Sequence, residues 1–202
     1  MLASVAVATE SELLLLAREG DVQAYAEFVR VFERRVRALL GRLLDDERDV
    51  EEAAQDTFVQ AWRNLARFRG DSQPFTWLYR IAVNEALQRT RRKKLDLRSL
   101  DDLHPGDASF FDARSNVDTL AENRELSSYL AAKLRDLPFE YRAPLVLRDI
   151  EGWSNQEVAD ALELSLPAAK SRIHRARSQL REVVEVRREQ ERSAPPEAAA
   201  QD

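Results

Sequence analysis

The sequence predicts an all-α protein made of two helical domains joined by a flexible linker. Apolar residues recur at helical spacing over most of the 202 residues, and capping signals precede several of these runs. Only five residues are glycine, and no stretch alternates apolar and polar side chains as a strand would. These observations favour packed helices throughout.

Helical periodicity divides the first half of the chain into four expected helices. Thr9 and Glu12 have the spacing of a capping box, and Pro74 suits a first helical turn, where its missing N–H costs nothing. Phe58 and Trp62, four residues apart, are expected in the core. The helices are expected to begin after Thr9, at Asp21, near Asp45 or Asp46, and at Pro74, and the last three to end near Leu40, Leu65 and Lys94.

The composition of the chain limits the kinds of function that we expect. There is no cysteine, so no disulfide or thiolate metal site is expected, and the two histidines are far apart in the sequence. We expect no metal and no cofactor. No apolar run approaches the roughly 20 residues of a membrane span, and no signal peptide is recognisable, which favours a cytoplasmic protein without membrane insertion.

Charge is unevenly distributed along a chain of formal net charge −5. Residues 80–98 and 170–181 are strongly basic, whereas residues 45–56 and 101–125 are acidic. Two local basic faces are typical of a protein that touches nucleic acid at two places. An ordinary mosaic surface is the alternative that charge alone leaves open.

Residues 95–122 lose helical periodicity and carry turn residues, so the domain boundary is placed there. The expected divisions are a first domain over residues 1–94, an acidic linker over 95–122 and a second domain over 123–192. Residues 193–202, rich in Pro, Ala and Glu, are expected to be a disordered tail.

The stretch "EGWSNQEVADALELSLPAAKSRIHRARSQL", residues 151–180, predicts a helix-turn-helix. Ser154 and Glu157 form a capping box before a short helix, and Ser165 is a good N-cap for a longer one. The second helix of such a motif fits the major groove of DNA. Its outer face would show Lys170, Ser171, His174, Arg175 and Arg177. A helical hairpin with a solvated basic face is the alternative.

Two stretches resemble extracytoplasmic-function (group IV) sigma factors of bacterial RNA polymerase, members of the sigma-70 family. They are "DVEEAAQDTFVQAWRNLARFRGDSQPFTWLYRIAVNEALQRTRRKK" and "LRDLPFEYRAPLVLRDIEGWSNQEVADALELSLPAAKSRIHRARSQLR". The resemblance implies a sigma region 2 helical bundle followed by a sigma region 4 helix-turn-helix. It implies a factor that binds the polymerase core, recognises the promoter minus-thirty-five and minus-ten elements, and promotes DNA melting and initiation.

The resemblance also implies site residues. In region 2, Gly70, Asp71 and Ser72 match the loop that captures a minus-ten base, and Arg80, Asn84 and Arg89 lie in the DNA-reading stretch that follows. Trp77 either touches DNA or packs in the core. Candidates for contact with the β′ clamp helices are Gln55, Asp56, Gln60 and Arg63. In region 4, the minus-thirty-five positions are Lys170, Ser171, Arg172, His174 and Arg175, of which Arg172 would hold a phosphate.

Two departures from the family pattern concern the second helix of the motif. Many members carry Gly-Thr where this chain has Pro167-Ala168, so a threonine contact to the DNA backbone would be missing. His174 replaces an often aromatic or aliphatic residue. The further partners implied are the β flap of the polymerase, promoter DNA and an anti-sigma factor.

Three other classes compete with a sigma factor. A two-domain helix-turn-helix regulator that never melts DNA would have no use for the loop at residues 68–80 or for an acidic helix that binds β′. An enzyme is disfavoured because the sequence has no Gly-rich phosphate loop and no metal or Ser/His/Asp grouping that spacing supports. A helical adaptor would leave the basic face of the second helix unexplained.

Overall fold

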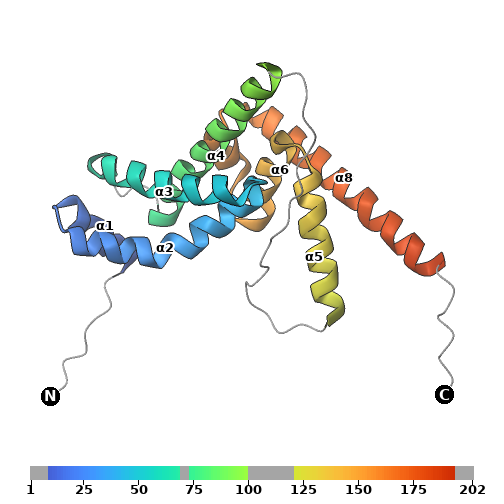
Figure 1. The fold of residues 1–202 in the computed structure, drawn as a ribbon, viewed down its shortest axis with the longest axis horizontal. Helices are drawn as coiled ribbons and strands as arrows, with labels where there is room; N and C mark the ends of the chain where they lie inside the picture. The colour runs from blue at the N-terminus through green and yellow to red at the C-terminus, as the bar shows by residue number, and fades with distance from the viewer. Residues whose placement is uncertain (1–8, 69–72, 100–120, 194–202) are drawn as a thin grey trace. The chain divides into compact units, whose positions relative to one another are not determined.

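The protein is all-α, as the sequence predicts. The structure, a computed structural model, describes residues 9–68, 73–99 and 121–193, and these residues form helices and no strand. They divide into two compact units, the first built from α1 to α4 and the second from α5 to α8 (Figure 1). None of the described helices is long and apolar enough to cross a membrane.

The first unit packs its helices around an apolar core. Its elements are α1 (Glu10–Arg18), α2 (Val22–Leu43), α3 (Glu47–Arg63), the 3₁₀ turn η1 (Leu65–Arg67) and α4 (Pro74–Ser99). Phe28, Phe32 and Leu39 of α2 are fully buried, as are Ala61 of α3 and Leu78 of α4. These side chains recur at helical spacing, so each helix presents one apolar stripe to the others.

Caps define where the first helices begin. Thr9 and Glu12 form the predicted capping box, with the Thr9 N–H donating to Glu12 Oε2 at 2.7 Å. These bonds hold the pKa of Glu12 below its ordinary value. Asp21 Oδ1 accepts from the N–H groups of Gln23 and Ala24, which starts α2. The caps satisfy backbone donors that have no partner inside a helix.

Two helices run further than the sequence predicts. The sequence predicts that a helix ends near Leu40, next to the helix-breaking residue Gly41, but α2 continues to Leu43. Leu43 and Leu44 are buried, and their burial outweighs the roughly 1 kcal/mol cost of a glycine inside a helix. Likewise α4 passes Lys94 and ends at Ser99.

The second unit contains the predicted helix-turn-helix. Its elements are α5 (Ala121–Asp136), α6 (Phe139–Leu145), the π-helical turn η2 (Val146–Ile150), α7 (Asn155–Ala161) and α8 (Leu166–Ser193). Pro138 and Gly152, residue types that commonly interrupt helices, lie between helices, and Gly152 has a φ of 76°. Pro144 lies inside α6, and the missing N–H of a proline is a common reason for helical bonds to shift as they do in η2.

Candidate nucleic-acid interface

Local capping positions both helices of the motif. The Ser154 N–H donates to Glu157 Oε2 at 2.8 Å, and the Glu157 N–H donates to Ser154 Oγ at 3.2 Å. The predicted capping box before α7 is therefore confirmed. Ser165 Oγ accepts from the Ala168 N–H at 3.3 Å, so the predicted N-cap of α8 is present as well.

The turn between α7 and α8 is tight. Glu163 adopts a left-handed φ of 55°, where glycine or asparagine is usual, and the Leu164 N–H donates to the Ala159 carbonyl at 2.8 Å. Ala159, Ile173 and Trp153 are buried, as expected for the inner face of the motif. The packed inner face holds α8 with its opposite face outward.

The outer face of α8 carries the residues predicted to read the minus-thirty-five element. Lys170, Ser171, His174 and Arg175 are exposed, and Arg172 is partly exposed. Within the described ranges, none of these five side chains makes a hydrogen bond or an ion pair. The structure thus brings all five together on one helix with their polar groups free for another molecule.

Arg177, on the same face, is different because it is already paired. Its Nε and Nη2 donate to the two oxygens of Asp149 at 2.8 Å and 2.5 Å. The hydrogen bond from Arg177 lowers the pKa of Asp149, and the same contact raises the pKa of Arg177. This two-point contact ties α8 to the segment before α7 and removes Arg177 from the set of free cations.

A second row of candidates lies on α4. Trp77, Arg80 and Asn84 are spaced so that they share one side of the helix. Asn84 is exposed, whereas Trp77 and Arg80 are partly exposed. The Nε atom of Arg80 is buried without a hydrogen-bond partner. The predicted loop residues Gly70, Asp71 and Ser72 lie outside the described residues.

Aromatic residues on either side of residues 69–72 pack against other side chains of the protein. The ring of Trp77 lies 5.2 Å from that of buried Phe68, measured between centroids. Phe75 and Tyr79 stack edge to face at 6.0 Å, and the Arg35 guanidinium lies over the Phe75 ring at 5.4 Å. Trp77 is therefore held against Phe68 while part of its surface stays accessible.

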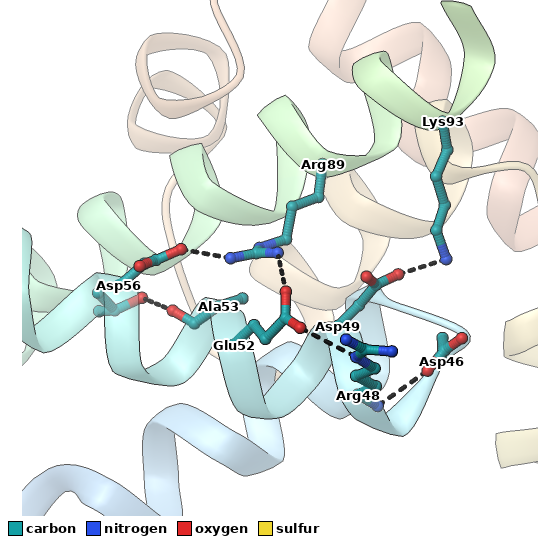
Figure 2. Close-up of polar contacts among 9 residues, drawn as sticks. Asp46, Arg48, Asp49, Glu52, Ala53, Asp56, Arg89 and Lys93 are labelled. Atoms are coloured by element: carbon teal, nitrogen blue, oxygen red, sulfur yellow. Dashed lines mark hydrogen bonds and ion pairs between the residues drawn. The ribbon is translucent and has the colours of Figure 1, made fainter. Parts of the chain in front are cut away.

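Arg89 lies on another side of α4, about 120° around the helix from Trp77. Only 15% of its side chain is exposed, and it bonds two carboxylates of α3. Figure 2 shows Arg89 between Glu52, at 3.2 Å, and Asp56, with Lys93 paired to Asp49 further along. The structure therefore does not bring Arg89 together with Trp77, Arg80 and Asn84.

The candidates for clamp contact lie along α3. Gln55, Asp56 and Arg63 are exposed, and Gln60 is partly exposed. In the described part of the chain, Asp56 is the only one of the four whose side chain makes an ion pair, and its partner is Arg89. These residues form an accessible strip of mixed polarity along the helix.

Sequence reasoning missed two apolar members of the same strip. Val59 is exposed, and Trp62 is 40% exposed with its ring 4.8 Å from that of Tyr25. The prediction that Trp62 lies in the core is wrong, because α2 and α4 contact α3 along its alanine-rich stripe instead. The spacing of Gln55, Val59 and Trp62 at i, i+4 and i+7 was the signal that could have revealed an outward position.

Comparison with known proteins decides the family. The family model for sigma-70 region 2 matches residues 28–95, and the model for sigma-70 region 4 matches residues 127–180. The chain belongs to the extracytoplasmic-function group of the sigma-70 family. As a sigma factor, it is a transcription initiation factor.

Relatives in several bacteria match this sigma factor over most of its length. The RNA polymerase sigma-H factor of Pseudomonas aeruginosa is 31% identical over 83% of this chain and 90% of its own. The ECF RNA polymerase sigma-E factor of Haemophilus influenzae is 32% identical over 85% of this chain and 93% of its own.

Solved structures share its fold. One is CnrH in complex with the cytosolic domain of CnrY, with a TM-score of 0.57, 28% identity and coverage of 86% of this chain and 96% of that one. Another is RpoE in complex with the anti-sigma factor NepR from Bartonella quintana, with a TM-score of 0.65 and 22% identity; the match covers 82% of this chain and 99% of that one. The described candidates of α3 and α4 fall inside the region 2 match, and those of α8 fall inside the region 4 match.

Proposed function

We propose that this sigma factor reads the minus-thirty-five element with α8, reads the minus-ten element and holds the melted strand with α4 and the loop before it, and binds the β′ clamp helices of the polymerase through α3. The observation that carries the proposal is the outer face of α8, where Lys170, Arg172 and Arg175 are unpaired among the described residues while Arg177 is held by Asp149.

The chemistry of the α8 face suits the edges of bases. Lys170 and Arg175 are donors of the kind that reach guanine acceptors or phosphates in the major groove. Ser171 accepts or donates, and His174 brings a ring nitrogen to the same face. Arg172, partly exposed at the side of this face, is placed to hold a phosphate.

The side of α4 that carries Trp77, Arg80 and Asn84 suits an opened strand. An aromatic face recovers about 1–3 kcal/mol per stacked base, which offsets the cost of unstacking. Arg80 is partly exposed, and a guanidinium is a good donor to phosphate and base oxygens. Gly70, Asp71 and Ser72 are proposed from the sequence to close around a flipped base.

The remaining assignments complete the proposal. Residues 1–94 would form region 2 and residues 123–192 region 4. The predicted linker, residues 95–122, and the predicted tail, residues 193–202, lie mainly outside the described residues, and α4 and α8 extend into these ranges as far as Ser99 and Ser193. The protein would act in the cytoplasm, without enzymatic activity and without a cofactor. Because the structural relative RpoE is bound to an anti-sigma factor, we propose that an anti-sigma factor also controls this chain.

The test is initiation with the polymerase. Purified protein is mixed with sigma-free bacterial core polymerase and a promoter library, and permanganate footprinting detects melted thymines. Selective transcription with reactive thymines near the start site supports the proposal. Binding to duplex sites without core, and neither initiation nor melting with core, would show a regulator instead.

A matched pair of lysines sharpens the test of the α8 face. Lys170 is exposed and unpaired, whereas Lys133 of α5 pairs with Asp136 at 2.8 Å. Lys170→Ala should weaken transcription and alter the minus-thirty-five sequence selected from the library, while Lys133→Ala should leave that sequence unchanged. An unchanged selected sequence for Lys170→Ala would remove this residue from the reading face.

A further inference from the structure

The helix α1 lies outside the residues that match the family model for region 2, which begin at residue 28. It nevertheless contacts both η1 and α4 of the same unit. We infer that α1 is a positioning element for minus-ten recognition, acting through Arg18 and through the ion pair of Glu10 with Arg35. Both contacts hold segments whose side chains set the Trp77 ring in place, so the inference rests on the proposed function of Trp77.

The first contact fixes the end of η1. Arg18 Nη1 donates to the Phe68 carbonyl at 3.3 Å, and the Phe68 N–H donates to the Leu65 carbonyl at 3.0 Å. Both backbone polar groups of Phe68 are therefore held. The Phe68 ring is buried and lies 5.2 Å from the Trp77 ring, measured between centroids. Arg18 thus acts on Trp77 through Phe68, because a shift of the Phe68 backbone would move the surface against which Trp77 packs.

The second contact fixes the first turns of α4. The guanidinium of Arg35 lies over the rings of Phe75 and Tyr79, at 5.4 Å and 6.0 Å from their centroids. Glu10 Oε1 of α1 pairs with Arg35 Nη1 at 3.7 Å. A cation is attracted to the face of an aromatic ring, so these contacts tie α1 to the part of α4 that carries Trp77.

The helix α1 is itself anchored to the unit. Leu13, Leu14 and Ala17 are buried, and the capping box at Thr9 fixes its first turn. A binding residue that packing already holds loses less conformational entropy when its ligand arrives. The opened strand would therefore meet a Trp77 ring held in place, and α1 contributes to this without touching DNA.

The experiment measures binding of a fluorescein-labelled single strand of DNA to holoenzyme assembled from core polymerase and the full chain. The strand carries the minus-ten sequence of a promoter selected from the library. Arg18→Gln should weaken binding about threefold, within the range for loss of one hydrogen bond, and Glu10→Gln about twofold. Affinity for a duplex that carries only the minus-thirty-five element should not change, because α8 belongs to the other unit.

Arg34 of α2 offers a matched control. It is exposed, and within the described residues its side chain makes no hydrogen bond or ion pair. Arg34→Gln removes the same charge from the same unit and should bind the strand as wild type does. Arg18→Lys keeps a donor for the Phe68 carbonyl and should restore most of the lost affinity.

Two readouts separate positioning from other roles. A direct contact of Arg18 with a phosphate would make Arg18→Gln lower the slope of log affinity against log salt by roughly 0.7, whereas positioning leaves the slope unchanged. In a Trp77→Ala background, Arg18→Gln should have no further effect on strand binding, because the ring through which it acts is missing. Circular dichroism checks that each variant keeps its helices at the assay temperature.

The positioning role is overturned if Arg18→Gln and Glu10→Gln bind the strand as Arg34→Gln does, if the salt slope falls, or if the full loss persists beside Trp77→Ala. Any of these results with a wild-type protein that initiates would leave the proposed function standing. A Trp77→Ala variant that binds the strand as wild type does would overturn the role of Trp77 and the positioning role with it. Wild-type protein that fails to initiate with core would overturn the proposed function and this inference together.

Discussion

Arg175 and Arg177 are two residues apart in α8, yet only Arg177 is paired among the described residues, and this difference predicts opposite effects of the same substitution. Arg175 is exposed and has no ion pair in the described part of the chain, whereas Arg177 makes a two-point contact with Asp149. Arg175→Gln should weaken promoter binding without loss of stability. Arg177→Gln should lower stability without changing promoter binding.

The size of the first effect follows from counterion release. A cation that neutralises one phosphate of duplex DNA contributes about 0.9 to the slope of log affinity against log salt. Between roughly 50 mM and 200 mM salt, loss of that contact changes the fall in affinity by about 3.5-fold. If Arg175 instead binds a base edge, Arg175→Gln should cost about 1–3 kcal/mol on the selected sequence and little on others.

The size of the second effect follows from exposure. The side chains of Arg177 and Asp149 are 51% and 34% exposed, so solvent screens the pair and its contribution falls in the range of surface ion pairs. Two-point geometry places it near the top of that range, at about 1 kcal/mol. For a chain of this size the thermal midpoint should fall by about 2–4 °C.

The assay uses holoenzyme on a fluorescent promoter fragment over a salt series, with thermal melting of each free variant. The polymerase contributes equally to the slope of log affinity against log salt for wild type and variant. The difference between the two slopes is therefore the contribution of the substituted residue. Equal changes in slope for Arg175→Gln and Arg177→Gln would refute the reasoning, because the contact with Asp149 would then not decide which arginine is free.

Three further predictions concern stability and pH. Phe32 is fully buried, with its ring 4.7 Å from that of Phe28. Phe32→Ala should therefore lower the free energy of unfolding, measured by urea titration, by about 3–5 kcal/mol. The Tyr25 hydroxyl donates to the Phe58 carbonyl at 2.5 Å, so Tyr25→Phe should lower the free energy of unfolding by about 0.5–1.5 kcal/mol. Because burial raises the pKa of Tyr25, the wild-type phenol should resist ionisation in an alkaline absorbance titration. Since the pKa of Asp149 is lowered in the folded state, its pair with Arg177 stabilises above the ordinary carboxyl pKa and is lost as pH falls through the lowered one; the melting curves of wild type and Arg177→Gln should therefore converge in acid.

The starts of several helices could be predicted from residues that are close together in the sequence. The capping boxes at Thr9 and Ser154 and the N-cap at Ser165 need only residues a few positions apart, and all three are present. The end of α2 was not readable in this way. Burial of Leu43 decided it against the signal of Gly41, and burial depends on helices that are distant in the sequence.

The exposed faces of the helices could be predicted only in part, because helical periodicity is also a local signal. Periodicity placed Lys170, Ser171, His174 and Arg175 on one side of a helix, and the structure leaves that side exposed. Periodicity did not show that Trp62 faces outward, because a helix with apolar residues on more than one side does not reveal which side its neighbours will cover.

The sequence by itself determined the helices, their caps, the helix-turn-helix and the membership of the sigma-70 family, because each depends on residues close together in the chain or on motifs in a fixed order. The tertiary structure decided which cations are free. Arg177 and Asp149 are 28 residues apart, and Arg89 and Asp56 are 33 apart, so neither pair is visible in helical spacing. Only the packing of one helix against another brings a carboxylate within reach of a particular arginine, and that packing separates the cations held within the protein from those left unpaired among the described residues.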